Sequence, residues 1–246
     1  MNNPKLKILR PDLSRGTSFK KGGIIPRRAS PITKYVIGID EVGRGTLAGP
    51  VMVAAVLLSQ KSLLHLGFGG QVKIKIKKLG AVKDSKKLSA RQREEWVRRI
   101  KELKIPFAIA RVSPAVIDRI NISRAANLAA FRAFSSLTTR YTLHPTHYSI
   151  FLDGGLYLKN KTWAKDNGVS AATVIRGDEK IPAVALASIV AKVHRDRYMV
   201  GLAKEFPGYG FEVHMGYGTA RHLNALRKLG PAPVHRRSFL RSSLLH

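Results

Sequence analysis

Short apolar runs of strand length alternate with longer helical segments from residue 35 to residue 229 of this chain. The runs are rich in β-branched residues and end at turn residues, which is the pattern of buried strands. The predicted strands cover residues 35–40, 50–58, 105–113, 148–153 and 171–175. A glycine-rich turn joins the first two and predicts a hairpin. Because helical segments separate the later strands, we expect an α/β domain with a mixed sheet.

Helices are predicted between these strands and after the last one. Ser89 is a suitable N-cap for a helix over residues 90–104, and a long helical region follows Pro114, with a break near Asn121. The most regular helical pattern covers residues 183–206. A further helix over residues 219–229 is expected to end at Gly230.

The charge of the chain indicates a polyanionic partner. Its 44 Lys and Arg residues against 15 Asp and Glu residues give a net charge of +29. Nucleic acid is the first candidate; a membrane surface is the alternative, but we find no apolar run of bilayer length. Since the chain has no cysteine, any metal must be held by carboxylate, histidine or water, and cytoplasmic residence fits this composition.

One basic segment precedes the predicted domain over residues 34–246, and another is an insertion within it. Residues 1–33 are rich in Gly, Pro and Ser, so we expect a flexible arm, although an organelle-targeting peptide would look similar. Residues 62–82 form a basic insertion in which Val72, Ile74 and Ile76 alternate with lysines. Those lysines either bind nucleic acid or protect the edge of a sheet from aggregation.

Carboxylates occupy unusual positions at the ends of two predicted strands. Asp40 and Glu41 finish the first strand, and Asp153 finishes the fourth. Ligand sites of α/β sheets form at strand ends, so these acids are candidates for one shared site. The alternative is that each aspartate only caps a helix or a turn.

A further acid lies inside the alanine-rich helical segment. Ser188, Lys192 and Asp196 recur every four residues and therefore share one stripe of the helix. The alternative for Lys192 and Asp196 is a surface ion pair, which contributes less than about 1 kcal/mol. Clustering Asp196 with Asp40 and Asp153 would require cations, and oxygen ligands favour Mg²⁺ or Mn²⁺. In so basic a protein, such ions suggest two-metal hydrolysis of a phosphodiester.

Seven motifs occur in an order that resembles the ribonuclease HII family, the type 2 ribonucleases H. They are GIDEVGRGTLAGPV, DSKKLS, NISRAANLAAFRAF, FLDG, ASIVAKVHRDRYM, PGYGFEVHMGYGTARH and GPAPVHRRSF. The resemblance covers about residues 34–239 and implies a ribonuclease H-like fold, with a mixed five-stranded sheet flanked by helices and a helical C-terminal part. The sequence departs from the family pattern at Met215, where a lysine is usual, and in the segment over residues 62–82, which is longer than usual.

The resemblance also implies roles for single residues. The metal-binding catalytic carboxylates would be Asp40, which bridges two Mg²⁺ or Mn²⁺ ions, Glu41, Asp153 and Asp196. The Gly43-Arg44-Gly45 segment would approach the ribose 2′-hydroxyl, and Tyr217 would stack on the following deoxyribose; a plain hairpin turn and a core tyrosine are the alternatives. Further candidates for strand or phosphate contacts are Asp84, Ser85, Lys86, Asn121, Ser188 and Lys192, of which Asn121 could instead be a helix cap. Four histidines are expected to be structural, namely His194, His214, His222 and His235.

The implied activity is endonucleolytic cleavage of RNA in RNA/DNA hybrids and on the 5′ side of single ribonucleotides in duplex DNA. Products would carry a 3′-hydroxyl and a 5′-phosphate, and the role would be removal of ribonucleotides and primers by a monomer. Two alternatives remain at this point: a ribonuclease HIII-type enzyme and a non-catalytic nucleic-acid-binding protein. The intact carboxylates argue against the second alternative, because acids facing phosphate weaken metal-free binding.

Overall fold

A five-stranded sheet with the order β3-β2-β1-β4-β5 organises the computed structural model, which describes residues 35–59, 87–160 and 162–240. The strands are β1 (Tyr35–Val42), β2 (Val51–Ser59), β3 (Phe107–Val112), β4 (Tyr148–Asp153) and β5 (Ser170–Val174). β1 pairs antiparallel with β2, and β2 with β3, whereas β4 runs parallel to both β1 and β5. The predicted hairpin and mixed sheet are confirmed.

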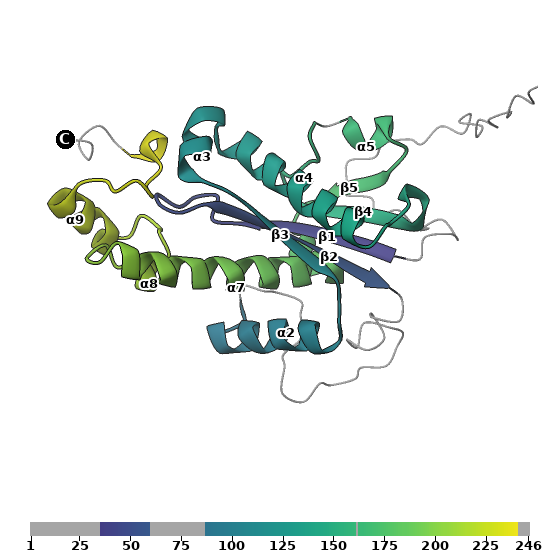
Figure 1. Cartoon of the computed structure of the whole chain (residues 1–246), viewed down its shortest axis with the longest axis horizontal. Coiled ribbons are helices and arrows are strands. Elements are labelled where there is room, and N and C mark those ends of the chain that lie inside the picture. Colours follow the sequence, from purple (N-terminus) through teal and green to yellow (C-terminus); the bar gives the residue numbers. More distant parts are fainter. Residues whose placement is uncertain (1–34, 60–86, 161, 241–246) are drawn as a thin grey trace, which may run out of the picture.

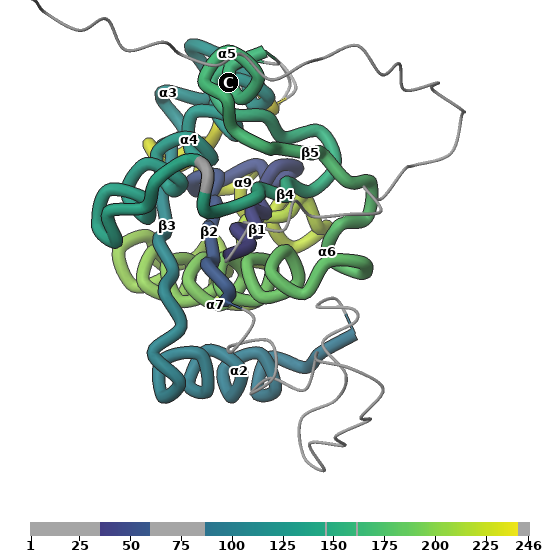
Figure 2. Tube along the Cα trace, turned by 90° about the vertical axis from the view of Figure 1, so that its right-hand side faces the viewer, coloured from purple at the N-terminus to yellow at the C-terminus, as the bar shows by residue number. Residues whose placement is uncertain are grey.

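Helices cover both faces of this sheet (Figures 1 and 2). They are α2 (Ala90–Glu102), α3 (Pro114–Ile120), α4 (Ile122–Arg140), α5 (Trp163–Asp166), α6 (Gly177–Lys180), α7 (Pro182–Glu205), α8 (Phe211–His214) and α9 (Ala220–Leu229), with short 3₁₀ turns at Pro145–His147 and Arg237–Phe239. α3 and α4 lie on one face, α7 lies on the other, and α2 packs outside α7. α8 and α9 form the helical C-terminal part.

Side-chain chemistry at the helix ends explains where the helices begin. Ser89 accepts a hydrogen bond from the backbone of Gln92, and the Gln92 side chain accepts one from the backbone of Ser89, so α2 starts with a capping box. Asn121 has a φ of 64° and caps α4 by accepting from the backbone N–H of Arg124. The predicted break between α3 and α4 therefore lies at Asn121.

Three apolar clusters hold the layers together. The first lies between the sheet and α4, the second between the sheet, α7 and α2, and the third inside the C-terminal part. β2 is buried on both faces, which accounts for its unbroken apolar sequence. Gly38 of β1 faces the start of α7, where an added Cβ would lie 2.0 Å from the carbonyl carbon of Ala183. α7 therefore packs directly on the backbone of β1, beside the strand end that carries Asp40.

Several expectations fall on residues that the structure does not describe. These are the arm over residues 1–33, the insertion over residues 62–82 with its alternating strand, and the candidates Asp84, Ser85 and Lys86. Among the described residues, no helix combines the length and the apolar character that crossing a membrane requires.

Candidate active site

The register between β1 and β4 brings two of the predicted acids to the same place. Ile39 lies opposite Leu152 in the parallel pair, and both side chains are buried in the cluster beneath α4. Side chains alternate across a strand, so the next residues, Asp40 and Asp153, both point to the opposite face, which α7 covers. Asp40 and Asp153 come from distant parts of the chain, but they lie side by side at the ends of β1 and β4, on the same face of the sheet.

Asp40, Glu41 and Asp153 form the acidic cluster of this site. One oxygen of each carboxylate lies within 4.8 Å of the others. Asp40 Oδ1 accepts a hydrogen bond of 2.8 Å from the Glu41 N–H, and Asp153 Oδ1 accepts one of 2.7 Å from the Gly177 N–H. The Ser188 hydroxyl of α7 donates to Asp40 as well. These contacts fix the orientation of the carboxylates before any ligand arrives.

Burial and mutual repulsion make the acidic cluster electrostatically unfavourable by itself. The pKa of Asp40 lies well above its usual range because the side chain is buried, and because Glu41 and Asp153 add repulsion; the Ser188 hydrogen bond opposes the shift. Burial also raises the pKa of Glu41, against the effect of Arg44, whose Nη1 lies 3.2 Å from Glu41 Oε1. Glu41 Oε2 is buried and has no hydrogen-bond partner. The site thus offers three carboxylates, and one of them, Glu41, has a buried oxygen without a hydrogen-bond partner. Such hard oxygen ligands fit a divalent cation such as Mg²⁺ or Mn²⁺.

The acidic cluster forms part of the wall of a cavity of about 410 Å³. The other lining residues are Val42, Gly43, Arg44, Arg93, Asp178, Ser188, Lys192 and Tyr217. The structure thus brings most of the predicted site residues together. Asn121 is not among them, and its position as the cap of α4 supports the alternative interpretation.

Asp178 lines this cavity and was missed in the sequence. It belongs to the short helix α6 and only 3% of it is exposed. α6 follows β5, and its Gly177 donates the hydrogen bond that fixes Asp153. The stretch RGDEK reads as a charged surface loop, which hid the residue. Its place shortly after a strand end was a usable signal, because the same criterion had selected Asp40 and Asp153.

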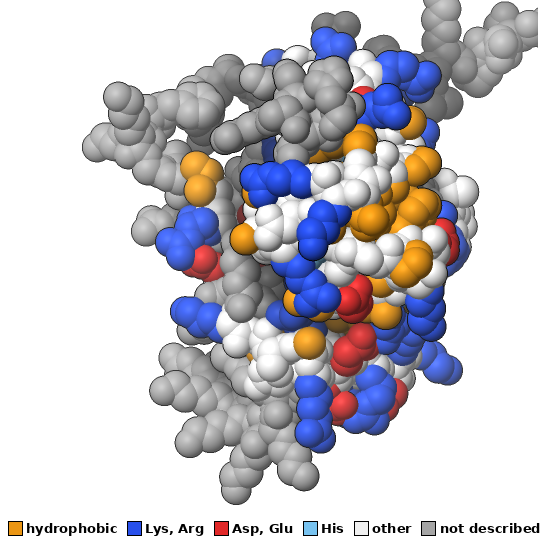
Figure 3. Space-filling view, turned by 90° about the vertical axis from the view of Figure 1, so that its left-hand side faces the viewer, with side chains coloured by type: hydrophobic (Ala, Val, Ile, Leu, Met, Phe, Trp, Pro, Cys, Tyr) orange, Lys and Arg blue, Asp and Glu red, His pale blue; other side chains and the backbone are white. Residues whose placement is uncertain are grey.

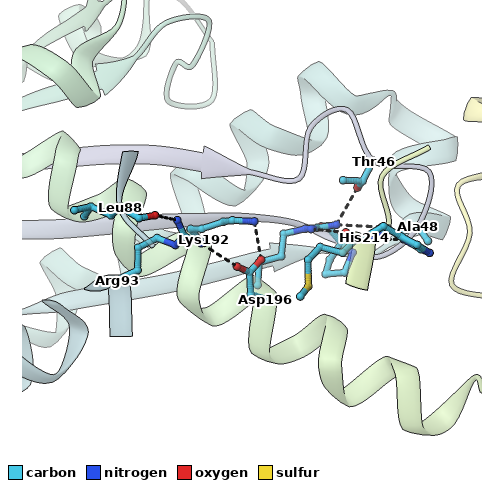
Figure 4. A network of polar contacts seen from close by, with 11 residues as sticks. Thr46, Ala48, Leu88, Arg93, Lys192, Asp196 and His214 are labelled. Carbon is cyan, nitrogen blue, oxygen red and sulfur yellow. Dashed lines mark hydrogen bonds and ion pairs between the residues drawn. The ribbon is translucent and has the colours of Figure 1, made fainter. Parts of the chain in front are cut away.

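Asp196 lies outside the acidic cluster and is not among the residues that line the cavity. Its Oδ1 accepts from Lys192 Nζ at 2.8 Å, and its Oδ2 lies 3.9 Å from Arg93 Nη2. Figure 4 shows the Asp196 carboxylate between these two cations. The geometry matches the ion-pair alternative weighed in the sequence analysis, extended by Arg93 from α2.

The turn after β1 contributes its arginine and one open glycine to the site. Gly43 has a φ of 85°, and an added Cβ would lie 2.2 Å from Arg195 Nε, so both the backbone conformation and a buried side chain require a glycine here. Nothing lies within 4 Å of a Cβ added at Gly45. Tyr217 lines the cavity with 42% of its surface exposed, which excludes the alternative of a buried core tyrosine.

Three of the four histidines pack together in the C-terminal part. His222 Nδ1 lies 2.9 Å from the Tyr217 carbonyl and must donate to it, so His222 Nε2 accepts from His235 Nε2 at 3.0 Å. The His214 ring stacks on His222 with 4.4 Å between centroids. The His222 ring is therefore neutral, in agreement with the pKa that burial lowers to about 4, and its hydrogen bond holds the backbone at Tyr217. His194 lies elsewhere, on α7 against Phe107, and all four positions agree with the structural role expected for them.

Comparisons with known proteins identify the family. The model of the family described as Ribonuclease HII matches residues 37–242. A ribonuclease HII from Caldicellulosiruptor bescii is 38% identical over 211 residues, which are 86% of this chain and 89% of the relative. One from Chlorobium phaeobacteroides is 39% identical over 210 residues, covering 85% and 91% of the two chains.

Solved structures agree with the fold. A ribonuclease H2 from Pyrococcus horikoshii has a TM-score of 0.64 and 25% identity, covering 83% of this chain and 93% of its own. A ribonuclease HII from Archaeoglobus fulgidus, solved in a complex with PCNA, has a TM-score of 0.63 and 27% identity, covering 84% and 96%. A Mn²⁺ complex of a ribonuclease HIII is 21% identical with a TM-score of 0.60 and supports the fold alone. With the matching family model and relatives, these results establish that the chain belongs to the ribonuclease HII family of RNA-hydrolysing endonucleases.

Proposed function

We propose that this enzyme hydrolyses the RNA strand of RNA/DNA hybrids and also cuts duplex DNA on the 5′ side of a single embedded ribonucleotide. Each cut leaves a 3′-hydroxyl and a 5′-phosphate, and the role is removal of ribonucleotides and primers by a cytoplasmic monomer. The observation that carries the proposal is one cavity that holds the acidic cluster, the turn after β1 and the exposed ring of Tyr217. Lys and Arg side chains also predominate over acidic ones on the face in Figure 3, as a polyanionic ligand requires.

The acidic cluster and Asp178 are the residues we assign to two Mg²⁺ or Mn²⁺ ions. Asp178 is preferred to Asp196 as the fourth ligand because Asp178 is buried in the cavity wall. Asp196 does not line the cavity, and its carboxylate pairs with Lys192 and Arg93. When bound, the ions supply activation of the attacking water and stabilisation of the leaving 3′ oxygen.

The remaining lining residues suit the substrate. Arg93 and Lys192 bring positive charge to the cavity wall, where a scissile phosphate would lie. Gly45 leaves its backbone accessible to a sugar, and the 2′-hydroxyl is the group that distinguishes RNA from DNA. The Tyr217 ring is exposed enough to pack on the neighbouring sugar.

The proposed substrate can be tested with three duplexes of one sequence: all DNA, DNA with one ribonucleotide, and DNA paired with a continuous RNA strand. We expect metal-dependent cutting of the second and third duplexes, none of the first, and none of any duplex by Asp153→Asn. Equal cutting of the all-DNA duplex, or full activity of Asp153→Asn, would show that the proposed site or substrate is wrong.

The fourth ligand can be tested by comparing Asp178→Asn with Asp196→Asn. We expect Asp178→Asn to weaken Mn²⁺ binding at least tenfold by titration calorimetry, because it removes a carboxylate from the cavity wall. Asp196→Asn should retain Mn²⁺ binding. It should raise the KM for the duplex, because Arg93 and Lys192 lose the carboxylate that orients both side chains at the cavity. The reverse pattern would restore Asp196 as the ligand predicted from the sequence.

A further inference from the structure

Two arginines, Arg195 and Arg236, are completely buried beneath the turn after β1. Among the described residues, neither lies within ion-pair distance of a carboxylate. A buried charge is costly unless hydrogen bonds satisfy it. Burial lowers the pKa of Arg236 to about 9, which leaves it cationic at neutral pH. The acceptors that offset this cost show what the two side chains hold.

Arg195 of α7 joins the turn after β1 to the segment that carries Tyr217. Its Nη1 donates to the Met215 carbonyl at 2.8 Å. Its Nη2 donates to Thr46 Oγ1 at 2.9 Å and to the Ala48 carbonyl at 3.1 Å (Figure 4). Four of the five N–H groups of this guanidinium have acceptors, since Nε also donates to the carbonyl of Pro50.

Arg236 holds the same turn through other carbonyls. Its Nη2 donates to the Gly43 carbonyl at 2.6 Å, Nη1 to the Arg44 carbonyl at 2.9 Å and Nε to the Gly49 carbonyl at 3.0 Å. These carbonyls belong to a loop with little strand or helix pairing of its own. The planar fork of a guanidinium can bind several carbonyls at fixed angles, which a lysine ammonium cannot do.

Close backbone packing leaves the turn and the Tyr217 segment no room to shift. The N–H of Leu47 donates to the Gly216 carbonyl at 2.8 Å. Gly216 has a φ of 82°, and an added Cβ would lie 2.6 Å from the Ala48 carbonyl oxygen. On the other side, the Arg195 side chain fills the space beside Gly43. Two elements that are far apart in the sequence thus meet around two buried guanidiniums.

We propose that Arg195 and Arg236 are positioning residues that determine substrate selectivity, by holding the Gly43–Gly45 turn and Tyr217 at one fixed separation. This inference rests on the proposed function, in which the turn and Tyr217 contact neighbouring sugars of one strand. A single ribonucleotide offers only one RNA-to-DNA step, so its recognition requires both elements in register. A continuous RNA strand offers many equivalent steps and tolerates a looser arrangement.

The test compares Arg236→Lys with the wild-type enzyme on the single-ribonucleotide duplex and on the continuous hybrid. Arg236→Lys keeps the charge and loses the fork. We expect kcat/KM to fall at least tenfold more on the single-ribonucleotide duplex than on the hybrid, with Mn²⁺ affinity unchanged, because the acidic cluster is not touched. Leu137→Ala is the matched control: Leu137 is a fully buried residue of α4 in the cluster between this helix and the sheet, so its truncation destabilises the protein without touching the turn.

The outcomes separate this inference from the proposed function. A wild-type enzyme that cuts the single-ribonucleotide duplex no faster than all-DNA duplex would refute the proposed function and the inference with it. A selective wild-type enzyme whose Arg236→Lys variant loses activity equally on both substrates, as expected for Leu137→Ala, would refute the inference alone. A selective loss in Arg236→Lys, absent in Leu137→Ala, would support it.

Discussion

Burial of His222 predicts that the protein loses stability as the pH falls below neutrality. The side chain is completely buried, and burial lowers its pKa from 6.5 to about 4. Between these values the unfolded chain binds a proton that the folded protein does not. The stabilising contribution is therefore fully present above pH 6.5 or so and is lost as the pH falls toward about 4. For these two pKa values, lowering the pH from about 7.5 to about 5 costs roughly 2 kcal/mol.

Urea unfolding of the wild type and of His222→Asn at the two pH values tests this magnitude. The introduced amide side chain does not titrate, so the free energy of unfolding should depend on pH less steeply in the variant, by about 2 kcal/mol. The pH dependence of the variant must be subtracted from that of the wild type because Asp40 acts in the opposite direction. Its raised pKa stabilises the folded protein at low pH, and it does so in both proteins. Wild type and variant curves that run parallel between the two pH values would refute the reasoning.

Three further predictions concern the turn, a helix cap and the acidic cluster. Gly43→Ala should lower the free energy of unfolding by about 2 kcal/mol or more, because the added Cβ would overlap Arg195. Gly45→Ala should change the free energy of unfolding little, so equal thermal midpoints of the two variants would contradict this prediction. Ser89→Ala should cost about 1 kcal/mol in urea unfolding through loss of the capping box, and no loss would mean that the box contributes nothing. Asp40→Asn should abolish cutting yet raise the thermal midpoint in EDTA, since it removes a buried acid with a raised pKa; a lower midpoint would exclude electrostatic strain in the cluster.

Most of the fold could be predicted from the sequence because burial determines it locally. The run over residues 148–153 coincides with β4, and the long helix predicted over residues 183–206 is α7, which spans Pro182–Glu205. The first is a short apolar run bounded by turn residues, and the second is too long for a strand, so length and flanking residues assign each one. The four-residue helices α5, α6 and α8 were not predicted, because so short a segment has no periodicity to read.

The acids show how far the sequence predicts which residues lie together in the cavity. Asp40 and Asp153 could be paired because strand ends meet at one edge of a sheet. Asp178 follows the end of β5 closely and met the same criterion, but the charged stretch around it resembles a surface loop and hid it. The helical spacing put Asp196 on one stripe with Ser188 and Lys192, but a stripe does not reveal how far along the helix the cavity extends. The partner Arg93 is about a hundred residues away in the sequence and was not foreseen.

The parallel pairing of β1 with β4 also constrains the order in which the protein can mature. Tyr35 pairs with Tyr148, so the chain must be synthesised past β4 before Asp153 can join Asp40 and Glu41. Contacts of such high sequence separation form late and slow folding. An emerging chain that has only β1, β2 and β3 thus carries half of the proposed metal ligands and none of α7. Ion affinity would appear only when the last strands and α7 have docked, so a nascent or misfolded molecule could bind nucleic acid through its positive charge without cutting it.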